Sequence, residues 1–347
     1  MNVLFLINYA GSGGTEAYVE ALIAGLPSVC CALCCNVDGR LAQRLRAKGI
    51  PVFQLRMRHP FDRRAAKALA AYCRAQHIDL IHAQYPRENR IALLARRYGS
   101  GARVVYTAHL SLHQPLWWRV LNRSSKDDAV IALTDTQRTL LIQNGFSAER
   151  IYVIPNGVAR RSREKRTPDG VFRMLTAARL SLEKGLLFLC DALSALRGKT
   201  TLPFRLEIFG EGPQRKRLER RIKKLGLNGI VSLRGFCEDV PFAQADLYVS
   251  PSRSETMSLA LLEAMAVGLP VMATNASAAL VKGICGLTAP YGDADAFSDG
   301  LLRLMTDRPL RERFAAAAPH YDIAETCRRT AERYQRSLHH GTEETEI

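Results

Sequence analysis

The stretch SRSETMSLALLEAMAVGLPVMAT, residues 252–274, determines how the rest of this sequence is interpreted. Two glutamates, Glu255 and Glu263, stand in it with seven residues between them, and Gly268 and Pro270 lead into a short apolar run. The segment is otherwise apolar enough to belong to a protein core. Because a carboxylate is costly to bury without a partner, this pair of acids needs a physical explanation.

A helix that begins only near Ser258 explains the pattern. Glu255 then lies in the loop before the helix, and Glu263 lies on the helix near its start. The first N–H groups, near Ser258 and Leu259, are available to an anion. A carboxylate can accept hydrogen bonds from both vicinal hydroxyls of a ribose or hexose. The alternative is one acid in a loop and one exposed acid on a helix, without any ligand.

The rest of the chain alternates short β-branched or apolar runs with helical patterns, which predicts an α/β protein with parallel sheets covered by helices. A chain of 347 residues is long for one core and suits two domains. In the first half, strands are predicted at 3–8, 29–35, 51–55, 79–83, 103–108, 129–133 and 151–155, and helices at 14–25, 61–76, 87–98 and 135–144. In the second half, strands are predicted near 171–177, 204–210, 230–234, 246–250 and 270–273, and helices near 184–197, 213–226, 258–267 and 293–306.

The segment 154–170 interrupts this alternation with turn residues and a run of charges, and we interpret it as an interdomain link. We therefore predict two tandem Rossmann-like, doubly wound parallel-sheet domains, residues 1–155 and 156–320, that face each other across a cleft. An amphipathic helix at 321–340 is expected to complete the first domain. Ligands of open α/β sheets bind at the carboxyl ends of the strands, so the functional residues are expected in that cleft.

A glycine-rich loop, NYAGSGGTEAY at 8–18, follows the first predicted strand and opens a helix. Gly13 and Gly14 let the backbone approach a ligand, and the helix start offers N–H groups to an anion. A nicotinamide-dinucleotide fingerprint would have Gly or Ala where this chain has Glu16, although Asp38 imitates its ribose-binding acid. A nicotinamide-dependent oxidoreductase is therefore a less favoured alternative, and a plain tight turn is another.

Two cations stand in the segment AARLSLEKG, residues 177–185. Arg179 ends the first strand of the second domain, and Lys184 comes just before the next helix. Two cations at a junction between strand and helix suit a diphosphate, through charge-assisted hydrogen bonds. The alternative for Lys184 is an ordinary surface lysine.

Positive charge is concentrated in the first half of the chain. The net charge is +16, and residues 1–165 hold 24 Lys and Arg against 11 Asp and Glu. Residues 40–74 hold ten basic residues and one acid, Asp62. Such a surface attracts nucleic acid, anionic lipid or a phosphorylated substrate, and the alternative is a solvated basic face.

The helix predicted over 61–76 combines basic and apolar faces, which is typical of attachment to an anionic membrane surface. A non-enzymatic polyanion-binding or nucleic-acid-binding protein would explain the charge. It would not explain the glutamate pair, and no nucleic-acid module is recognised, so no nucleic-acid partner is expected. The predicted membrane or acceptor patch comprises Arg58, Arg63, Arg64, Lys67 and Arg74.

The cysteines and the D-x-D motif do not indicate a metal site. Four of the nine cysteines fall in the run VCCALCC at 29–35, which we interpret as a buried strand in a reducing compartment. The DAD sequence at 293–295 begins a predicted helix and suits an N-cap. We expect no metal and no other cofactor. With no apolar run of transmembrane length and a start that reads as a strand, the protein is expected in the cytoplasm, with peripheral attachment to the inner face of the cytoplasmic membrane.

Taken together, these motifs resemble those of the family 4 (group 1) glycosyltransferases, which adopt the two-domain GT-B fold. The resemblance rests on Glu255 and on the stretch EAMAVGLPVMAT, which begins with Glu263. It extends over nearly the whole chain. GSGGTEAY matches the family's glycine-rich loop, IPNGV its crossover between domains and ARLSLEKG its Arg/Lys pair. The chain departs from the family where Met257 and Ser258 replace a more usual Phe-Gly, and where NASAALVKGICG lacks the usual acid.

The resemblance implies a role for each matching position. Glu263 would bind the nucleotide ribose, and Glu255 would contact hydroxyls of the donor sugar. Arg179 and Lys184 would neutralise the diphosphate. His109 would face the transferred sugar from the first domain, and the alternative is a histidine at a strand end that is hydrogen-bonded to the backbone. The remaining donor contacts implied are Gly13 and Gly14, the backbone near Ser258 and Leu259, and Phe236 beside the base.

The resemblance also implies the reaction. The expected enzyme is a retaining, metal-independent hexosyltransferase that uses a UDP- or GDP-sugar. Its acceptor would be a glycan or a lipid-linked glycan, in the synthesis of cell-surface polysaccharide or glycolipid. We expect attack on the same face of the sugar, because the sequence nominates no evident nucleophile. Departure of the nucleotide diphosphate builds negative charge that Arg179 and Lys184 would stabilise.

Overall fold

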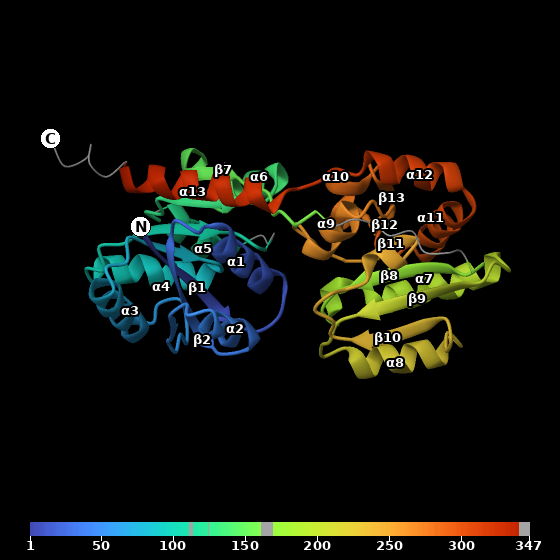
Figure 1. Ribbon diagram of the computed structural model, residues 1–347, viewed down its shortest axis with the longest axis horizontal. Helices are drawn as coiled ribbons and strands as arrows, with labels where there is room; N and C mark the ends of the chain where they lie inside the picture. Colours follow the sequence, from blue (N-terminus) through green and yellow to red (C-terminus); the bar gives the residue numbers. More distant parts are fainter. Residues whose placement is uncertain (111–113, 124, 161–168, 340–347) are drawn as a thin grey trace. The chain divides into compact units, whose positions relative to one another are not determined.

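The computed structural model describes residues 1–110, 114–123, 125–160 and 169–339 of the chain. The chain forms two compact units, residues 1–157 with 323–347, and residues 158–322 (Figure 1). Most of the charge run in the predicted link 154–170 lies outside the described residues, at 161–168. The last residue of the helix predicted over 321–340 and the tail after it also lie outside them.

The first unit is built on a seven-stranded parallel sheet with the strand order β3-β2-β1-β4-β5-β6-β7. All seven strands were predicted from their β-branched and apolar runs. Cys34 and Cys35 are buried as expected, whereas Cys30, the first residue of β2, is exposed. The strands are β1 (Asn2–Tyr9), β2 (Cys30–Val37), β3 (Val52–Gln54), β4 (Leu80–Ala83), β5 (Arg103–Thr107), β6 (Ala129–Ala132) and β7 (Ile151–Val153).

Helices connect these strands as parallel pairing requires. From β1 the chain adds β2 and then β3 on one side, and it then crosses to the other side of β1 and adds β4 to β7 there. Each crossover between parallel strands is right-handed. The helices α1 and α2 therefore lie on one face of the sheet, and α3 to α6 lie on the other. The sequence patterns did not predict α2 or α5. The helices are α1 (Gly14–Gly25), α2 (Arg40–Ala47), α3 (Arg63–Ala75), α4 (Pro86–Arg97), α5 (Leu116–Arg123), α6 (Asp135–Gln143) and α13 (Ile323–His339), with a 3-10 turn η1 (Ala148–Arg150).

The second unit repeats this architecture around a six-stranded parallel sheet with the order β10-β9-β8-β11-β12-β13. The predicted fold class, two doubly wound parallel-sheet domains, is therefore confirmed. The strands are β8 (Phe172–Ala177), β9 (Phe204–Phe209), β10 (Val231–Gly235), β11 (Leu247–Ser250), β12 (Val271–Thr274) and β13 (Gly286–Ala289). The helices are α7 (Leu186–Lys199), α8 (Arg215–Lys224), α9 (Leu259–Ala266), α10 (Ala278–Val281), α11 (Ala294–Thr306) and α12 (Arg308–Ala317), with 3-10 turns η2 (Leu182–Lys184), η3 (Phe242–Gln244) and η4 (Asn275–Ser277).

The last described helix, α13, packs onto the first unit through a buried polar network. The Nδ1 atom of His82 on β4 lies 2.6 Å from the hydroxyl of Tyr334 on α13, and its Nε2 atom lies 2.7 Å from the hydroxyl of Thr107 on β5. All three side chains are buried. Burial, with a smaller contribution from His109, lowers the pKa of His82 to about 3, so this histidine is neutral at physiological pH.

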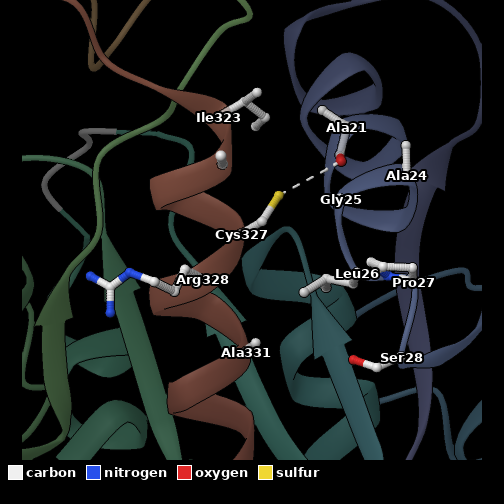
Figure 2. A pocket seen from close by; sticks show the side chains of 11 residues that line it. Ala21, Ala24, Gly25, Leu26, Pro27, Ser28, Ile323, Cys327, Arg328 and Ala331 are labelled. Atoms are coloured by element: carbon white, nitrogen blue, oxygen red, sulfur yellow. Dashed lines mark hydrogen bonds between the residues drawn. The ribbon is translucent and has the colours of Figure 1, made fainter.

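Helix α13 also lies beside α1, and the two helices approach closely at Gly25 (Figures 1 and 2). The Sγ atom of Cys327 is 3.8 Å from the carbonyl oxygen of Ala21. A Cβ atom added at Gly25 would lie 2.3 Å from that sulfur. Beside this contact is a cavity of about 540 Å³, lined by Ala21, Ala24, Gly25, Leu26, Pro27, Ser28, Ile323, Ala324, Cys327, Arg328 and Ala331.

The structure changes the interpretation of the predicted membrane helix. The apolar face of α3, which includes Leu69 and Cys73, packs into the core with α4. Its exposed face is basic, and parts of it are already bound: the Arg74 guanidinium donates to the carbonyl oxygens of Tyr98 (3.1 Å) and Gly99 (3.0 Å). Because its apolar face is inside the protein, α3 can offer a membrane charge but not an apolar face. Among the described residues, none of the helices has the length and apolar composition needed to cross a bilayer.

The contact between α1 and α13 predicts that Gly25→Ala destabilises the first unit. The new methyl group would overlap Cys327 Sγ, and overpacking of this kind typically costs about 1–3 kcal/mol of unfolding free energy. Urea or thermal unfolding of the full chain measures the loss.

Gly198→Ala is the matched control, because a Cβ atom at Gly198 meets nothing within 4 Å and the residue lies in helix α7. It should leave the stability unchanged or raise it by up to about 1 kcal/mol. If Gly25→Ala were as stable as Gly198→Ala, the close approach of α1 and α13 would be wrong.

Candidate functional site

The strand order of the second unit creates a natural binding position at the carboxyl ends of β8 and β11. From β8 the chain runs outward through β9 to β10, and after β10 it returns to β11 on the other side of β8. The loops that follow β8 and β11 therefore diverge. This reversal of strand order is where ligands bind in open α/β sheets.

A glycine brings these two loops together. Gly185 has a left-handed φ of 65°, and a Cβ atom there would lie 1.9 Å from the carbonyl oxygen of Pro251. The Arg253 N–H also donates to the Glu183 carbonyl at 2.8 Å. The loop after β8 is thus fixed against the loop after β11, and only glycine suits the contact position.

The result is a largely buried ion pair between Lys184 and Glu255. The lysine Nζ lies 2.6 Å from the carboxylate, and the two side chains are only 22% and 12% exposed. The Ser252 hydroxyl and the Thr256 N–H donate to the same carboxylate, each at 3.3 Å. Two residues that the sequence analysis assigned to a shared pocket are therefore in contact.

Arg179 lies two residues beyond the end of β8, in the loop and not at the strand end as predicted. It is exposed, and its guanidinium makes no side-chain hydrogen bond within the described part of the chain. Burial tends to raise the pKa of the neighbouring Glu183. The Ser181 hydroxyl and the cations Lys184 and Arg179 outweigh this effect and hold that pKa below its usual value. The turn after β8 is therefore electropositive and suits an anion.

Helix α9 begins where the sequence predicted. It starts at Leu259, and Ser258 is its N-cap, with the Ser258 hydroxyl accepting from the Leu261 N–H at 3.4 Å. Glu255 lies in the preceding loop, and Glu263 lies half-buried on the helix. Helix N-termini carry partial positive charge, so this end of α9 also favours an anion.

A residue that the sequence analysis missed, Tyr248 on β11, lies close to both acids. Its buried hydroxyl donates to the Ala177 carbonyl at 3.4 Å. Burial raises the pKa of Tyr248, and the carboxylates of Glu255 and Glu263 raise it further, so both acids act on one phenol. Phe236 is exposed just after the end of β10. The second unit therefore combines cations, carboxylates and a helix N-terminus at one edge of its sheet.

The first unit has its own reversal of strand order, between β1 and β4. Gly13 is the N-cap of α1 in an extended conformation, and Gly14 begins the helix. The Tyr85 hydroxyl, just after β4, donates to the Thr15 hydroxyl at 2.9 Å. The glycine-rich loop and the end of β4 therefore meet at this edge. A Cβ atom added at Gly13 would lie only 2.5 Å from the carboxylate of Glu16.

His109 follows β5 at the same edge of the first sheet, and Gln84 orients its ring. The amide nitrogen of buried Gln84 donates to the His82 carbonyl at 3.2 Å, which leaves its Oε1 atom to accept from His109 Nε2 at 2.8 Å. This arrangement places the proton on Nε2 and leaves Nδ1 as an acceptor. The His109 and Tyr18 rings form a T-shaped pair with their centroids 5.0 Å apart, and burial lowers the pKa of His109 to about 3.

The remaining predicted features are also placed. Asp293 caps α11 by accepting from the Ala296 N–H at 2.9 Å, which confirms the N-cap interpretation of the DAD sequence. Asp38 stands where a dinucleotide fingerprint has its ribose-binding acid. Its carboxylate accepts from the Arg46 guanidinium at 2.7 Å and from the Gly39 N–H at 2.7 Å. Within residues 1–110, 114–123, 125–160 and 169–339, no group of three or more His, Cys, Asp or Glu could hold a metal ion.

Comparisons with known families cover both units. The model of Glycosyltransferase Family 4 matches residues 12–161, and the model of Glycosyl transferases group 1 matches residues 159–321. Each model thus corresponds to one parallel-sheet unit, and the segment with the two glutamates falls in the second.

Several bacterial proteins are related in sequence. The chain is 31% identical over 57% of its length to the exopolysaccharide phosphotransferase SCO2592 of Streptomyces coelicolor, of which it covers 22%. It is 30% identical over 58% of its length to the alpha-D-kanosaminyltransferase of Streptomyces kanamyceticus, of which it covers 58%. It is 30% identical over 52% of its length to the amylovoran biosynthesis glycosyltransferase AmsK of Erwinia amylovora, of which it covers 48%. The chain therefore spans less than two thirds of each of these relatives.

Solved structures share the fold over nearly the whole chain. The Anabaena protein HepE in complex with UDP-glucose matches with a TM-score of 0.84 and 24% identity, over 97% of this chain and 100% of that one. A glycosyltransferase from Rickettsia africae matches with a TM-score of 0.81 and 18% identity, over 97% of this chain and 98% of that one. At these identities the likeness concerns the fold, which is GT-B.

The hydrogen bond between Gln84 and His109 predicts how the histidine titrates. Gln84→Glu places a carboxylate against the Nε2–H group and should raise the pKa of His109 above its value of about 3, because a nearby negative charge favours the imidazolium. NMR titration of the His109 ring resonances measures the change.

Gln84→Leu is the control for this titration. It removes the acceptor without adding charge, and burial still holds the His109 pKa low. The same pKa in the Gln84→Glu variant and the unchanged chain would contradict the assigned contact.

Proposed function

Because the chain belongs to the family 4 (group 1) glycosyltransferases, we propose that it transfers a hexose-type sugar from a UDP- or GDP-sugar to a glycan or lipid-linked acceptor. The proposed setting is the synthesis of cell-surface polysaccharide or glycolipid. The observation that carries the proposal is the buried contact of Lys184 with Glu255 at the strand reversal of the second unit. A cation for phosphate and an acid for sugar hydroxyls are the two groups that a nucleotide-sugar requires side by side.

UDP-glucose is the first donor to test. HepE, which shares the fold, was crystallised with UDP-glucose, and the related kanosaminyltransferase and AmsK are named as sugar transferases. Nucleotide release from UDP-glucose, compared with release from GDP-mannose, tests the proposed reaction directly. Release from neither donor, with or without glycan acceptors, would count against it.

The proposed donor contacts follow the chemistry of each group. Arg179 and Lys184 bind the diphosphate, with the N–H groups at the start of α9, near Ser258 and Leu259. Glu263 accepts from the ribose hydroxyls, and Glu255 from hydroxyls of the transferred sugar. In the proposed complex, Phe236 lies beside the base, and Gly13, Gly14 and His109 contribute from the first unit.

We propose that the reaction retains the anomeric configuration by same-face attack and needs no metal. The bond between the anomeric carbon and the β-phosphate oxygen breaks as the acceptor oxygen bonds to the same face of that carbon. The proton of the acceptor hydroxyl passes to the departing phosphate oxygen. Lys184 and Arg179 stabilise the negative charge that develops on the diphosphate. A glycosyl-enzyme adduct found by intact mass measurement would overturn this mechanism.

The role of Lys184 predicts a large loss of rate in Lys184→Ala. Removing a charged hydrogen bond to the leaving group should weaken transition-state binding by about 1.5–3 kcal/mol. The corresponding loss in kcat/KM is roughly 10-fold to over 100-fold. Steady-state assays of UDP release measure it.

Lys199→Ala is the matched control for this rate measurement. Lys199 also forms an ion pair in the second unit, with Asp299 at 2.6 Å, but it lies at the far end of α7 from Lys184. Its removal should leave kcat/KM unchanged. Turnover of Lys184→Ala close to that of Lys199→Ala would refute the assignment.

We further propose that the basic face of α3 attaches the protein to an anionic membrane. Arg58, Arg63, Arg64, Lys67 and Arg74 are all exposed, and each Lys or Arg near such a surface contributes about 1 kcal/mol. The triple variant Arg63→Gln/Arg64→Gln/Lys67→Gln should therefore sediment with anionic vesicles on the order of 100-fold more weakly. Salt should weaken binding of the unchanged chain.

Helix α8 of the second unit provides a control with the same change of charge. Lys216, Arg217 and Lys223 on α8 are exposed, and replacing all three by Gln also removes three positive charges. That variant should sediment like the unchanged chain. Equal losses in both triple variants would show a response to net charge and not to the α3 face.

A further inference from the structure

Helix α5 of the first unit exposes three large apolar side chains. Leu116 is 72% exposed, Val120 57% and Trp117 54%. At 100° per residue these three side chains lie within about 100° of one another around the helix axis. Three large apolar side chains on one exposed stripe of an eight-residue helix are a contiguous patch, unlike the single exposed residues found on most surfaces.

A single buried polar residue, Asn122, anchors α5 to the protein. Buried Asn122 donates to Gln114 Oε1 at 2.7 Å and to the Asn144 carbonyl at 2.8 Å, and it accepts from the Arg90 guanidinium of α4 at 3.1 Å. Arg90 also lies over the Trp118 ring, 5.4 Å from its centroid. The inward side of α5 therefore combines Asn122 with half-buried Trp118 and Leu121, whereas an ordinary amphipathic helix would not leave three further large apolar side chains exposed.

The charged residues of α5, half-buried Arg119 and exposed Arg123, are both positive. Arg119 and Arg123 lie within about 60° of Leu116 on one side of the stripe, and Lys126 follows the helix. The nearby acids are withdrawn from the surface: Asp127 is buried, and Asp128 binds the Arg96 guanidinium at 2.7 Å. Within the described residues of α5 and the loop after it, the exposed charges beside this stripe are cations, which complement an anionic bilayer.

We propose that α5 inserts Leu116, Trp117 and Val120 into the headgroup region of an anionic membrane. Trp places its apolar ring in that interface, and long Arg side chains keep their charge in the headgroup layer while their stems cover apolar surface. Interfacial helices of this kind penetrate about 5–10 Å. A protein partner is less suited, because stable protein interfaces use about 20–30 residues a side and α5 offers three apolar ones.

This inference extends the membrane attachment proposed above and divides it between two helices. Helix α3 offers charge alone, since its apolar face is in the core, whereas α5 offers the apolar side chains. Helix α4 lies between them: it packs against α3 and bonds to α5 through Arg90. The charge and the apolar side chains therefore come from neighbouring helices on one face of the sheet.

The chain contains its own reporter for the experiment. Its two tryptophans are Trp117 and Trp118, so intrinsic tryptophan fluorescence reports only on α5. Vesicles of phosphatidylglycerol and phosphatidylcholine should shift the emission to the blue, and lipids with brominated acyl chains should quench it. Vesicles of phosphatidylcholine alone should do neither.

Leu116→Ser/Val120→Ser tests the apolar stripe. This variant should bind the anionic vesicles at least about tenfold more weakly, since two apolar side chains lose their burial. Leu202→Ser/Ile284→Ser, which changes two exposed apolar residues of the second unit, is the matched control and should bind as the unchanged chain does. Nucleotide release by both variants without vesicles should be unaltered, so a failure of sugar transfer is distinguishable from a failure of insertion.

Three outcomes would overturn the proposal. If the protein sedimented with anionic vesicles and its tryptophan emission did not change, α3 alone would attach it and α5 would not insert. An equal response to neutral vesicles would remove the anionic requirement. A blue shift that grows with protein concentration in the absence of lipid would show that a second copy of the chain covers α5.

Discussion

The close approach of Gly185 to the carbonyl of Pro251 is the constraint on which the site of the second unit depends. Only a residue without a Cβ atom, in a left-handed conformation, lets the loop after β8 come this near to the loop after β11. The contact turns two flexible side chains, Lys184 and Glu255, into a pair that is held in place. Taking two charges out of water costs free energy, so a largely buried ion pair needs a backbone that fixes its geometry.

The two units solve the problem of binding at a strand reversal in different ways. The second unit presents charge: a lysine, two carboxylates and a helix N-terminus around Tyr248. In the first unit, burial keeps His109 and His82 uncharged and Gln84 fixes the His109 ring, at the same edge as the Glu16 carboxylate. A neutral imidazole with one acceptor nitrogen suits a sugar hydroxyl, whereas an imidazolium could only donate.

Much of this arrangement could be predicted from the sequence because it is local. Strands and their order in the chain follow from runs of β-branched residues, and the start of α9 follows from Ser258 and the apolar positions after it. Helix α5 was not predicted, and β13 was missed because its sequence GLTA has only one β-branched residue and no apolar run.

The contacts that orient the site could not be predicted in this way. Gln84 and His109 are 25 residues apart, and only the pairing of β4 with β5 brings them together. Nothing in the sequence around Gln84 distinguishes it from any other glutamine that follows a strand. Tyr248 is similar, since its closeness to both acids depends on where the loop and α9 fold back over β11.

The position of α13 in the chain has a consequence for how the protein is made. The hydroxyl of Tyr334 is the partner of His82, yet 252 residues separate them in the chain. While the ribosome is still translating the second unit, the nascent first sheet holds a histidine and a threonine on a face that its covering helix has not reached. That face stays open to water until residues 323–339 have been translated, which is after the whole of the second unit.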